Sequence, residues 1–217
     1  MRFAVRTSSV FCLFLVVFVQ DLSPSVFRPE QEALSSSNRA ERPRDQRIEK
    51  IGQILSRFDT GLSGDEEARI SFFIEAESRR YGYDPELILA MISTESSFQN
   101  WAVSEVGAQG LMQIVPETGR EIAENSRISW RGEDPLFDPF LNIRLGIQYL
   151  NALHQKFGNL RLALVAYNQG PGRVLHSLSH SEPIPMDYAE KVLTEYRNFL
   201  SVRIDPSVTP ISGGETS

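Results

Sequence analysis

The segment that begins at Asp84 constrains the fold more than any other part of this chain. Asp84 suits the N-cap of a helix, Pro85 suits its first turn, and Glu86 complements the positive end of the helix dipole. The apolar residues that follow lie all round this helix, which predicts a central element buried among other helices. These residues are Leu87, Ile88, Leu89, Ala90, Met91, Ile92 and Phe98.

The remaining sequence predicts more helices around this one. From 65 to 200 no stretch shows a sustained alternation of apolar and polar residues, so we expect a mostly α fold. Apolar residues at helical spacing also predict a short amphipathic helix ahead of this region and a last helix after Pro185. They are Ile48, Ile51, Leu55 and Phe58 in the former, and Tyr188, Val192, Tyr196 and Phe199 in the latter.

Composition divides the chain into four parts. We expect a leader at 1–22, and a flexible tether at 23–64 that is rich in Pro, Ser, Glu and Arg and contains the short helix. The folded domain is expected at 65–200, and a disordered tail at 201–217, where Pro, Ser, Gly and Thr accumulate.

The N-terminus has the features of a secretion signal. Arg2 and Arg6 precede an apolar run at 10–19, and polar residues follow from Gln20. We therefore expect an exported protein of the periplasm or cell envelope, with an uncleaved anchor as an alternative because no small-residue cleavage site follows. Cys12 is the only cysteine, so a chain without its leader can form neither a disulfide nor a thiolate metal site.

Charge and histidine content exclude several functions. A formal net charge of -6 argues against a nucleic-acid binder and against docking on anionic lipid. His176 and His180 are four residues apart but have no supporting carboxylate motif, so we expect surface residues. We expect no metal, no cofactor and a monomer.

Glu95 is the first candidate for chemistry. Leu87, Met91 and Glu95 follow one another at i, i+4 spacing, which places the carboxyl in line with an apolar stripe. Burial there would raise its pKa, and a glutamic acid with a raised pKa can act as a general acid. Position alone leaves an exposed, salt-bridged Glu95 equally open.

Four blocks of sequence surround this glutamate in a specific order. They are E-S-S-F at 95–98; S-E-V-G-A-Q-G-L-M-Q at 104–113 with Pro116 and Thr118; Asn142-Ile143 with Gly146 and Tyr149; and A-Y-N at 166–168 followed by G-P-G-R-V at 170–174. In these blocks the sequence resembles the soluble-lytic-transglycosylase family, over about Ile70 to Phe199. The resemblance implies a lysozyme-like catalytic domain.

The resemblance also implies an activity and a set of site residues. Enzymes of this family cleave the β-1,4 bond between N-acetylmuramic acid and N-acetylglucosamine in peptidoglycan glycan strands. They leave 1,6-anhydromuramoyl ends and use no water. The family's catalytic glutamate corresponds to Glu95. The implied substrate-binding residues are Ser104, Gln113, Thr118, Ala166, Tyr167, Asn168 and Tyr188.

The sequence departs from the family at a few positions. Ile184-Pro185 replace a Glu-Thr pair ahead of Tyr188, Trp101 replaces a proline, and Val115 replaces a methionine found in some members. The role of Tyr188 is therefore an expectation, which depends on where the structure places its side chain.

Two other functions stay open. A lysozyme-type hydrolase would need a second carboxylate, for which Glu105, Glu117 and Asp138 are candidates. A wall-binding module with little turnover, recruited to an envelope-spanning machine, would fit the expected tether.

Overall fold

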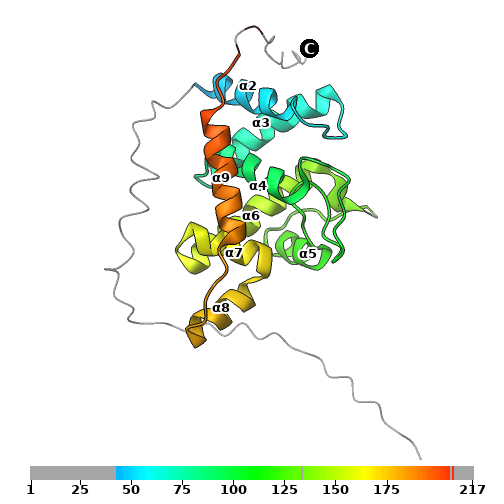
Figure 1. Ribbon diagram of the computed structural model, residues 1–217. Helices are drawn as coiled ribbons and strands as arrows, with labels where there is room; N and C mark the ends of the chain where they lie inside the picture. Colours follow the sequence, from blue (N-terminus) through cyan, green and yellow to red (C-terminus); the bar gives the residue numbers. More distant parts are fainter. Residues whose placement is uncertain (1–42, 133, 206, 208–217) are drawn as a thin grey trace, which may run out of the picture. The chain divides into compact units, whose positions relative to one another are not determined.

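The computed structural model describes residues 43–132, 134–205 and 207. This part of the chain contains eight α-helices, one 3-10 helix and no strand, which confirms the mostly α fold (Figure 1). The helices are α2 (Arg44–Leu55), α3 (Gly64–Arg80), α4 (Pro85–Ser96), α5 (Pro116–Asn125), η1 (Pro135–Phe137), α6 (Pro139–Phe157), α7 (Leu160–Gln169), α8 (Pro171–His180) and α9 (Asp187–Ser201).

The helix α4 is the central element that the sequence predicts. Its residues from Leu87 to Ile92 are all buried, and α2, α3 and α9 pack around it (Figure 1). Asp84 is the N-cap residue and Pro85 occupies the first turn, as expected, but the Asp84 side chain makes no capping hydrogen bond. Its Oδ2 instead accepts a hydrogen bond from the Tyr196 hydroxyl of α9. The residue that begins α4 therefore also joins it to the last helix.

The expected tether is wrong for its last part. The short amphipathic helix is present as α2, but it packs into the core through Ile48, Ile51, Ile54 and Leu55. Residues 44–64 thus belong to the folded domain rather than to a flexible segment. The expected leader, Cys12 and the tether up to residue 42 lie outside the described residues.

A buried lysine explains why α2 belongs to this core. The Lys50 side chain is almost fully inaccessible, and its Nζ lies 2.8 Å from Glu86 Oε1 on α4 and 3.2 Å from the Leu200 carbonyl oxygen on α9. Lysine and glutamate avoid burial unless they are paired. One ammonium group therefore joins three helices that are far apart in sequence.

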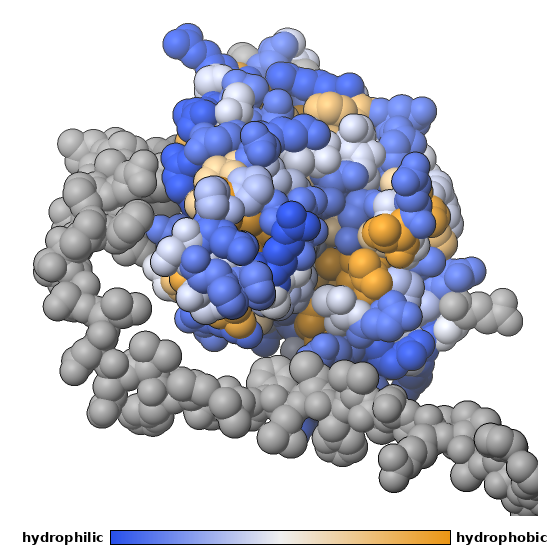
Figure 2. Space-filling model, turned by 60° about the horizontal axis from the view of Figure 1, so that its bottom comes forward, coloured by the Kyte–Doolittle hydropathy of each residue, from blue (hydrophilic) through white to orange (hydrophobic). Residues whose placement is uncertain are grey.

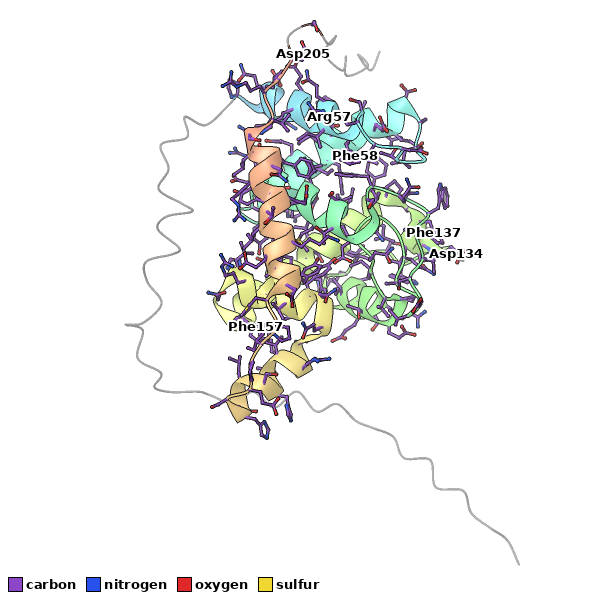
Figure 3. The ribbon with its side chains drawn as sticks, in the orientation of Figure 1. Arg57, Phe58, Asp134, Phe137, Phe157 and Asp205 are labelled. Carbon is purple, nitrogen blue, oxygen red and sulfur yellow. The ribbon has the colours of Figure 1, made fainter. Side chains whose placement is uncertain are left out.

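The expected disordered tail is also wrong at its start. Gln53 Nε2 donates to the Asp205 carbonyl oxygen at 2.9 Å, and the Asp205 backbone N–H donates to Gln53 Oε1 at 2.9 Å. These two bonds hold residues after α9 against α2, and Asp205 is labelled near α2 in Figure 3. Residues 206 and 208–217 of the expected tail lie outside the described part.

Replacement of Lys50 tests whether α2 is integral to the domain. Lys50→Ala removes the ammonium group that pairs with the buried carboxylate of Glu86. We therefore expect the free energy of unfolding to fall by about 3 kcal/mol. Urea denaturation measures this change. Lys156→Ala, at an exposed lysine of α6, is the control and should change stability by less than about 0.5 kcal/mol. The double variant Lys50→Met with Glu86→Leu replaces both charges by apolar side chains and should recover most of the lost stability. Equal stability of Lys50→Ala and wild type would contradict the role given to α2.

Candidate active site

Glu95 lies in the last turn of α4, where the chain reverses. The residues Ser97 and Phe98 both have positive φ angles, of 52° and 64°, which end the helix abruptly. The Ser96 hydroxyl donates to the Leu111 carbonyl oxygen at 2.9 Å and so joins this turn to the following loop. Glu95 itself is partly buried, which places its carboxyl between the apolar core and the surface.

Tyr188 contacts this carboxyl directly. Its hydroxyl donates a hydrogen bond to Glu95 Oε1 from the first turn of α9. Lys191 lies one turn further along α9, and its charge acts on Glu95. The structure therefore brings Tyr188 to Glu95, although Ile184-Pro185 replace the pair that often precedes this tyrosine in the family.

The pKa of Glu95 is raised to about 7. Burial of the carboxyl is the main cause, and it outweighs the Tyr188 hydrogen bond and the Lys191 charge, which both lower the pKa. Burial, followed by the negative charge of Glu95, raises the pKa values of Tyr167 and Tyr188 well above their ordinary value. At neutral pH the glutamate is close to half protonated and both phenols keep their protons.

A second tyrosine pair extends the site away from Glu95. The Tyr167 hydroxyl donates to the Met112 carbonyl oxygen at 2.9 Å, and its ring packs against Tyr149 with centroids 5.2 Å apart. The negative charges of Glu95 and of Tyr149 both act on the pKa of Tyr167. Tyr167 thus packs against Tyr149 and is close enough to Glu95 for that charge to raise its pKa.

The two tyrosines line a pocket of about 230 Å³. Four of the predicted substrate-binding residues are in its wall: Gln113, Thr118, Tyr167 and Asn168. The other lining residues are Ile114, Val115, Tyr149, Gln169 and Gly170. The space-filling view shows a hollow in one face of the molecule, with hydrophobic residues at its floor and hydrophilic residues around it (Figure 2). A pocket with aromatic walls and several polar groups suits a small polar ligand with apolar faces, such as a sugar ring.

Helix ends place the polar groups of the pocket. Asn168 is exposed near the end of α7, which stops at Gly170 with a φ of 85°. Glycine at 170 followed by Pro171 is a sequence pattern that breaks a helix. Thr118 lies in the first turns of α5, which begins at Pro116.

Asn142 of α6 holds the loop that leads to Gln113. Its Oδ1 accepts from the Met112 backbone N–H at 2.7 Å, and its Nδ2 donates to the carbonyl oxygens of Gln109 and Leu136 at 2.8 and 2.9 Å. A Cβ atom at Gly110 would lie 2.4 Å from that Nδ2, and the φ of Gly110 is 78°. Only glycine fits this position, which explains the glycine of the G-L-M-Q block.

Four predicted site residues are not among those that line the pocket: Glu95 and Tyr188, which bond to each other, and Ser104 and Ala166. Ser104 Oγ accepts from the Ala108 backbone N–H at 3.0 Å and so closes a turn within the loop. Ala166 is fully buried in α7. Their contact with a substrate stays a prediction.

The three candidates for a second carboxylate do not act on Glu95. Glu105 and Glu117 are exposed, and Asp138 caps α6 by accepting from the backbone N–H groups of Phe140 and Leu141. The causes of the raised pKa of Glu95 include none of them.

The site also contains groups that sequence reasoning did not single out, namely Tyr149, Lys191 and Asn142. Asn142, Gly146 and Tyr149 are spaced for one face of a helix, so this block could have indicated two of the three. Lys191 has no comparable signal. The described residues contain no group of three or more metal-ligating side chains, and His176 and His180 are exposed, as expected.

Comparison with known proteins identifies the family. A family model described as the transglycosylase SLT domain matches residues 72–183, which is more than half of the chain. This chain belongs to the transglycosylase SLT family. The resemblance that the motif blocks indicate is therefore confirmed.

Relatives of this SLT protein are named as enzymes of murein. It is 36% identical over 149 residues to a membrane-bound lytic murein transglycosylase C of Mannheimia succiniciproducens, and the match covers 64% of this chain and 41% of that relative. The chain thus spans less than half of that relative's length. No helix in the described part of this SLT protein is long and apolar enough to cross a membrane.

Solved structures support the lysozyme-like class of this SLT domain. An inactive mutant of the lytic transglycosylase Slt from Pseudomonas aeruginosa matches with a TM-score of 0.53 and 32% identity, over 64% of this chain and 24% of that one. The 70 kDa soluble lytic transglycosylase from Escherichia coli matches with a TM-score of 0.54 and 28% identity, over 70% of this chain and 30% of that one.

The raised pKa of Glu95 predicts a stability effect that does not depend on activity. The folded protein binds this proton more tightly than the unfolded chain, so the contribution of Glu95 to stability falls as the pH rises from about 4.5 to about 7 and stays low above that. Glu95→Gln removes this dependence. Between pH 4.5 and pH 8 the free energy of unfolding of wild type should therefore fall by on the order of 2–3 kcal/mol more than that of the variant. Urea denaturation at both pH values measures the difference, and a stability difference that is the same at both would contradict the raised pKa.

Proposed function

We propose that this protein is a peptidoglycan lytic transglycosylase that cleaves the β-1,4 bond between N-acetylmuramic acid and N-acetylglucosamine. The observation that supports this most strongly is the environment of Glu95. Its carboxyl has a pKa of about 7 and accepts a hydrogen bond from Tyr188. Its charge also acts on Tyr167, which lines a pocket that suits a sugar. The names of its relatives point to the same substrate.

Glu95 would act first as an acid. A pKa near 7 keeps enough of the carboxyl protonated to donate to the oxygen that bridges two sugars. Tyr188 donates to Oε1, so Oε2 is the oxygen that would hold the transferred proton. Cleavage of the C1–O bond then leaves an oxocarbenium-like muramoyl residue and an ionised Glu95.

The same carboxylate would then act as a base. It accepts the proton of the muramoyl C6 hydroxyl while that oxygen bonds to C1, which closes the 1,6-anhydro ring and returns Glu95 to its protonated form. Tyr188 and Lys191 both favour the ionised form in the interval between the two steps. An attack from within the same sugar also needs no bound water and gains from proximity.

Asn168 is the group that we assign to the substrate's N-acetyl carbonyl. It is exposed and lines the pocket on the same helix as Tyr167. The carbonyl could stabilise the developing charge at C1 if a hydrogen bond from the Asn168 amide holds it in place.

A second carboxylate is the feature that separates hydrolysis from transglycosylation. Most glycosidases use two carboxyl groups, one of which attacks the sugar or activates water. Burial, the Tyr188 hydrogen bond and the Lys191 charge are the causes of the shifted pKa of Glu95, and no carboxylate is among them. A lysozyme-type muramidase is therefore the second candidate.

The cellular setting is part of the proposal. The basic start and apolar run at 1–19 support export to the periplasm or cell envelope, and relatives named as membrane-bound support an envelope location. We propose a monomer that acts on glycan strands without a cofactor, and a partner in an envelope-spanning machine is compatible with this.

Digestion of purified sacculi by Glu95→Gln and wild type tests the chemistry. We expect the variant to lose at least about 100-fold in cleavage rate, because it can neither donate nor accept the proton. Mass spectrometry should find 1,6-anhydro ends in the wild-type products. Glu105→Gln, at an exposed carboxylate, is the control and should cleave within about twofold of wild type. Reducing ends would support the muramidase, and normal cleavage by Glu95→Gln would refute the role of Glu95.

Tyr188→Phe tests the hydrogen bond to Glu95. Cleavage needs protonated Glu95, so wild-type activity should fall as the pH rises through about 7. Loss of the Tyr188 hydroxyl removes a group that lowers the pKa of Glu95, so the midpoint of this fall should move to higher pH. The pH profile of kcat/KM, which reports the pKa of the free enzyme, measures the shift. Tyr196→Phe makes the same change on the same helix at a different carboxylate, Asp84, and should leave the midpoint in place.

A further inference from the structure

Trp101 is a large aromatic residue that the core does not use. Its side chain is 64% exposed, whereas the other tryptophan of the chain, Trp130, is partly buried and packs against Gly119. An exposed tryptophan on a folded loop usually contributes to binding rather than to stability.

The indole of Trp101 is nevertheless held in one position. The loop between α2 and α3 lies against its edge, since a Cβ atom on Gly61 would lie 3.2 Å from Trp101 Cδ1. On another side its ring packs against Phe137 of η1, with centroids 5.3 Å apart and a tilt of 39°. Phe137 is labelled in Figure 3 on the side of the domain away from α9.

The residues before Trp101 form hydrogen bonds to the same two segments, the loop between α2 and α3 and the helix η1. Asn100 is buried; its backbone N–H donates to the Thr60 carbonyl oxygen at 3.2 Å, and its Nδ2 donates to the Phe137 carbonyl oxygen at 3.1 Å. Gln99 Nε2 donates to the Asp59 carbonyl oxygen at 2.5 Å. The exposed ring is therefore preorganised, and a ligand that stacks on it loses little side-chain entropy.

The next residue connects Trp101 to the pocket. The Ala102 carbonyl oxygen accepts from the Gly110 backbone N–H at 3.0 Å and from Gln113 Nε2 at 3.1 Å. Gln113 is in the pocket wall. The loop that carries the exposed indole thus also supplies Gln113 to the pocket wall.

We propose that Trp101 is an aromatic platform on which a further sugar ring of the bound glycan strand stacks, beyond the pocket beside Glu95. This inference rests on the proposed function. A glycan strand is a polymer, and a pocket of about 230 Å³ holds only a short part of it, so the strand must continue over the adjoining surface. A flat, apolar indole face matches the C–H face of a pyranose ring.

Binding of strands by a variant that cannot cut them tests this platform. All proteins carry Glu95→Gln, and the ligands are purified peptide-free glycan strands and a disaccharide of the same repeat. Trp101→Ala should weaken strand binding about tenfold, and Trp101→Phe, which keeps a flat ring, should weaken it less than about threefold. Val106→Ala, at an apolar residue of the same loop that is 80% exposed, is the matched control and should bind as the parent does.

The disaccharide separates a stacking role from a general structural one. It can fill the pocket without reaching Trp101, so Trp101→Ala should bind it as tightly as the parent does. In a further Trp130→Phe background Trp101 is the only tryptophan, and its fluorescence should change with strands but not with the disaccharide.

The possible failures are distinguishable. Strand binding that is unchanged in Trp101→Ala would overturn the platform and leave the proposed function intact. Equal losses for strands and for the disaccharide would also overturn it, since the substitution would then have disturbed the pocket. If the parent bound neither ligand, the proposed function would fail and the platform with it.

Discussion

The antiparallel packing of α4 against α9 is the interaction on which the rest of this domain depends. At one end of the pair, Tyr188 of α9 bonds to Glu95 of α4; at the other end, Tyr196 bonds to Asp84. Lys50 adds a buried ammonium group between Glu86 and the Leu200 carbonyl oxygen, close to the second end. The position of the tyrosine beside the candidate acid is therefore a consequence of how two whole helices align, and α2 contributes to that alignment although it lies far from the pocket.

Opposing effects on one carboxyl give the site its chemical character. The apolar body of α4 withdraws Glu95 from water and raises its pKa, while a phenol and an ammonium group favour its charged form. Burial alone would give a group that stays protonated and makes a poor base, whereas strong ion pairing would give a permanent carboxylate that makes a poor acid. The balance near pH 7 suits a group that has to do both within one reaction.

Local features were predictable from the sequence, and the pairing of distant polar groups was not. The Asp84-Pro85 start, the all-round apolar residues of α4 and the break at Gly170 follow from short-range rules, and the structure has all three. The burial of Lys50 was not predicted because a lysine in an amphipathic helix is expected on the solvated face. Only its pairing with Glu86 and the Leu200 carbonyl oxygen in the folded domain makes its burial favourable. Asn142 stands in a motif block, but its role was not predicted for the same reason, since its three partners lie on other segments of the chain. Apart from Tyr188, the predicted site residues came from the motif blocks, in which residues that meet in the fold occur together.

The reversal after α4 explains why a reactive carboxyl can lie at the end of a helix that is otherwise buried. Ser97 and Phe98 adopt positive φ angles, a conformation that costs on the order of 1 kcal/mol or more for a residue other than glycine. Phe98 offsets this cost by burying its ring against Phe58 and Phe199. If α4 continued, its next turn would cover Glu95; because it stops, the carboxyl keeps partial access to a ligand while the preceding turns exclude water. The strained turn is thus the structural condition for a carboxyl that is poorly hydrated and still reachable.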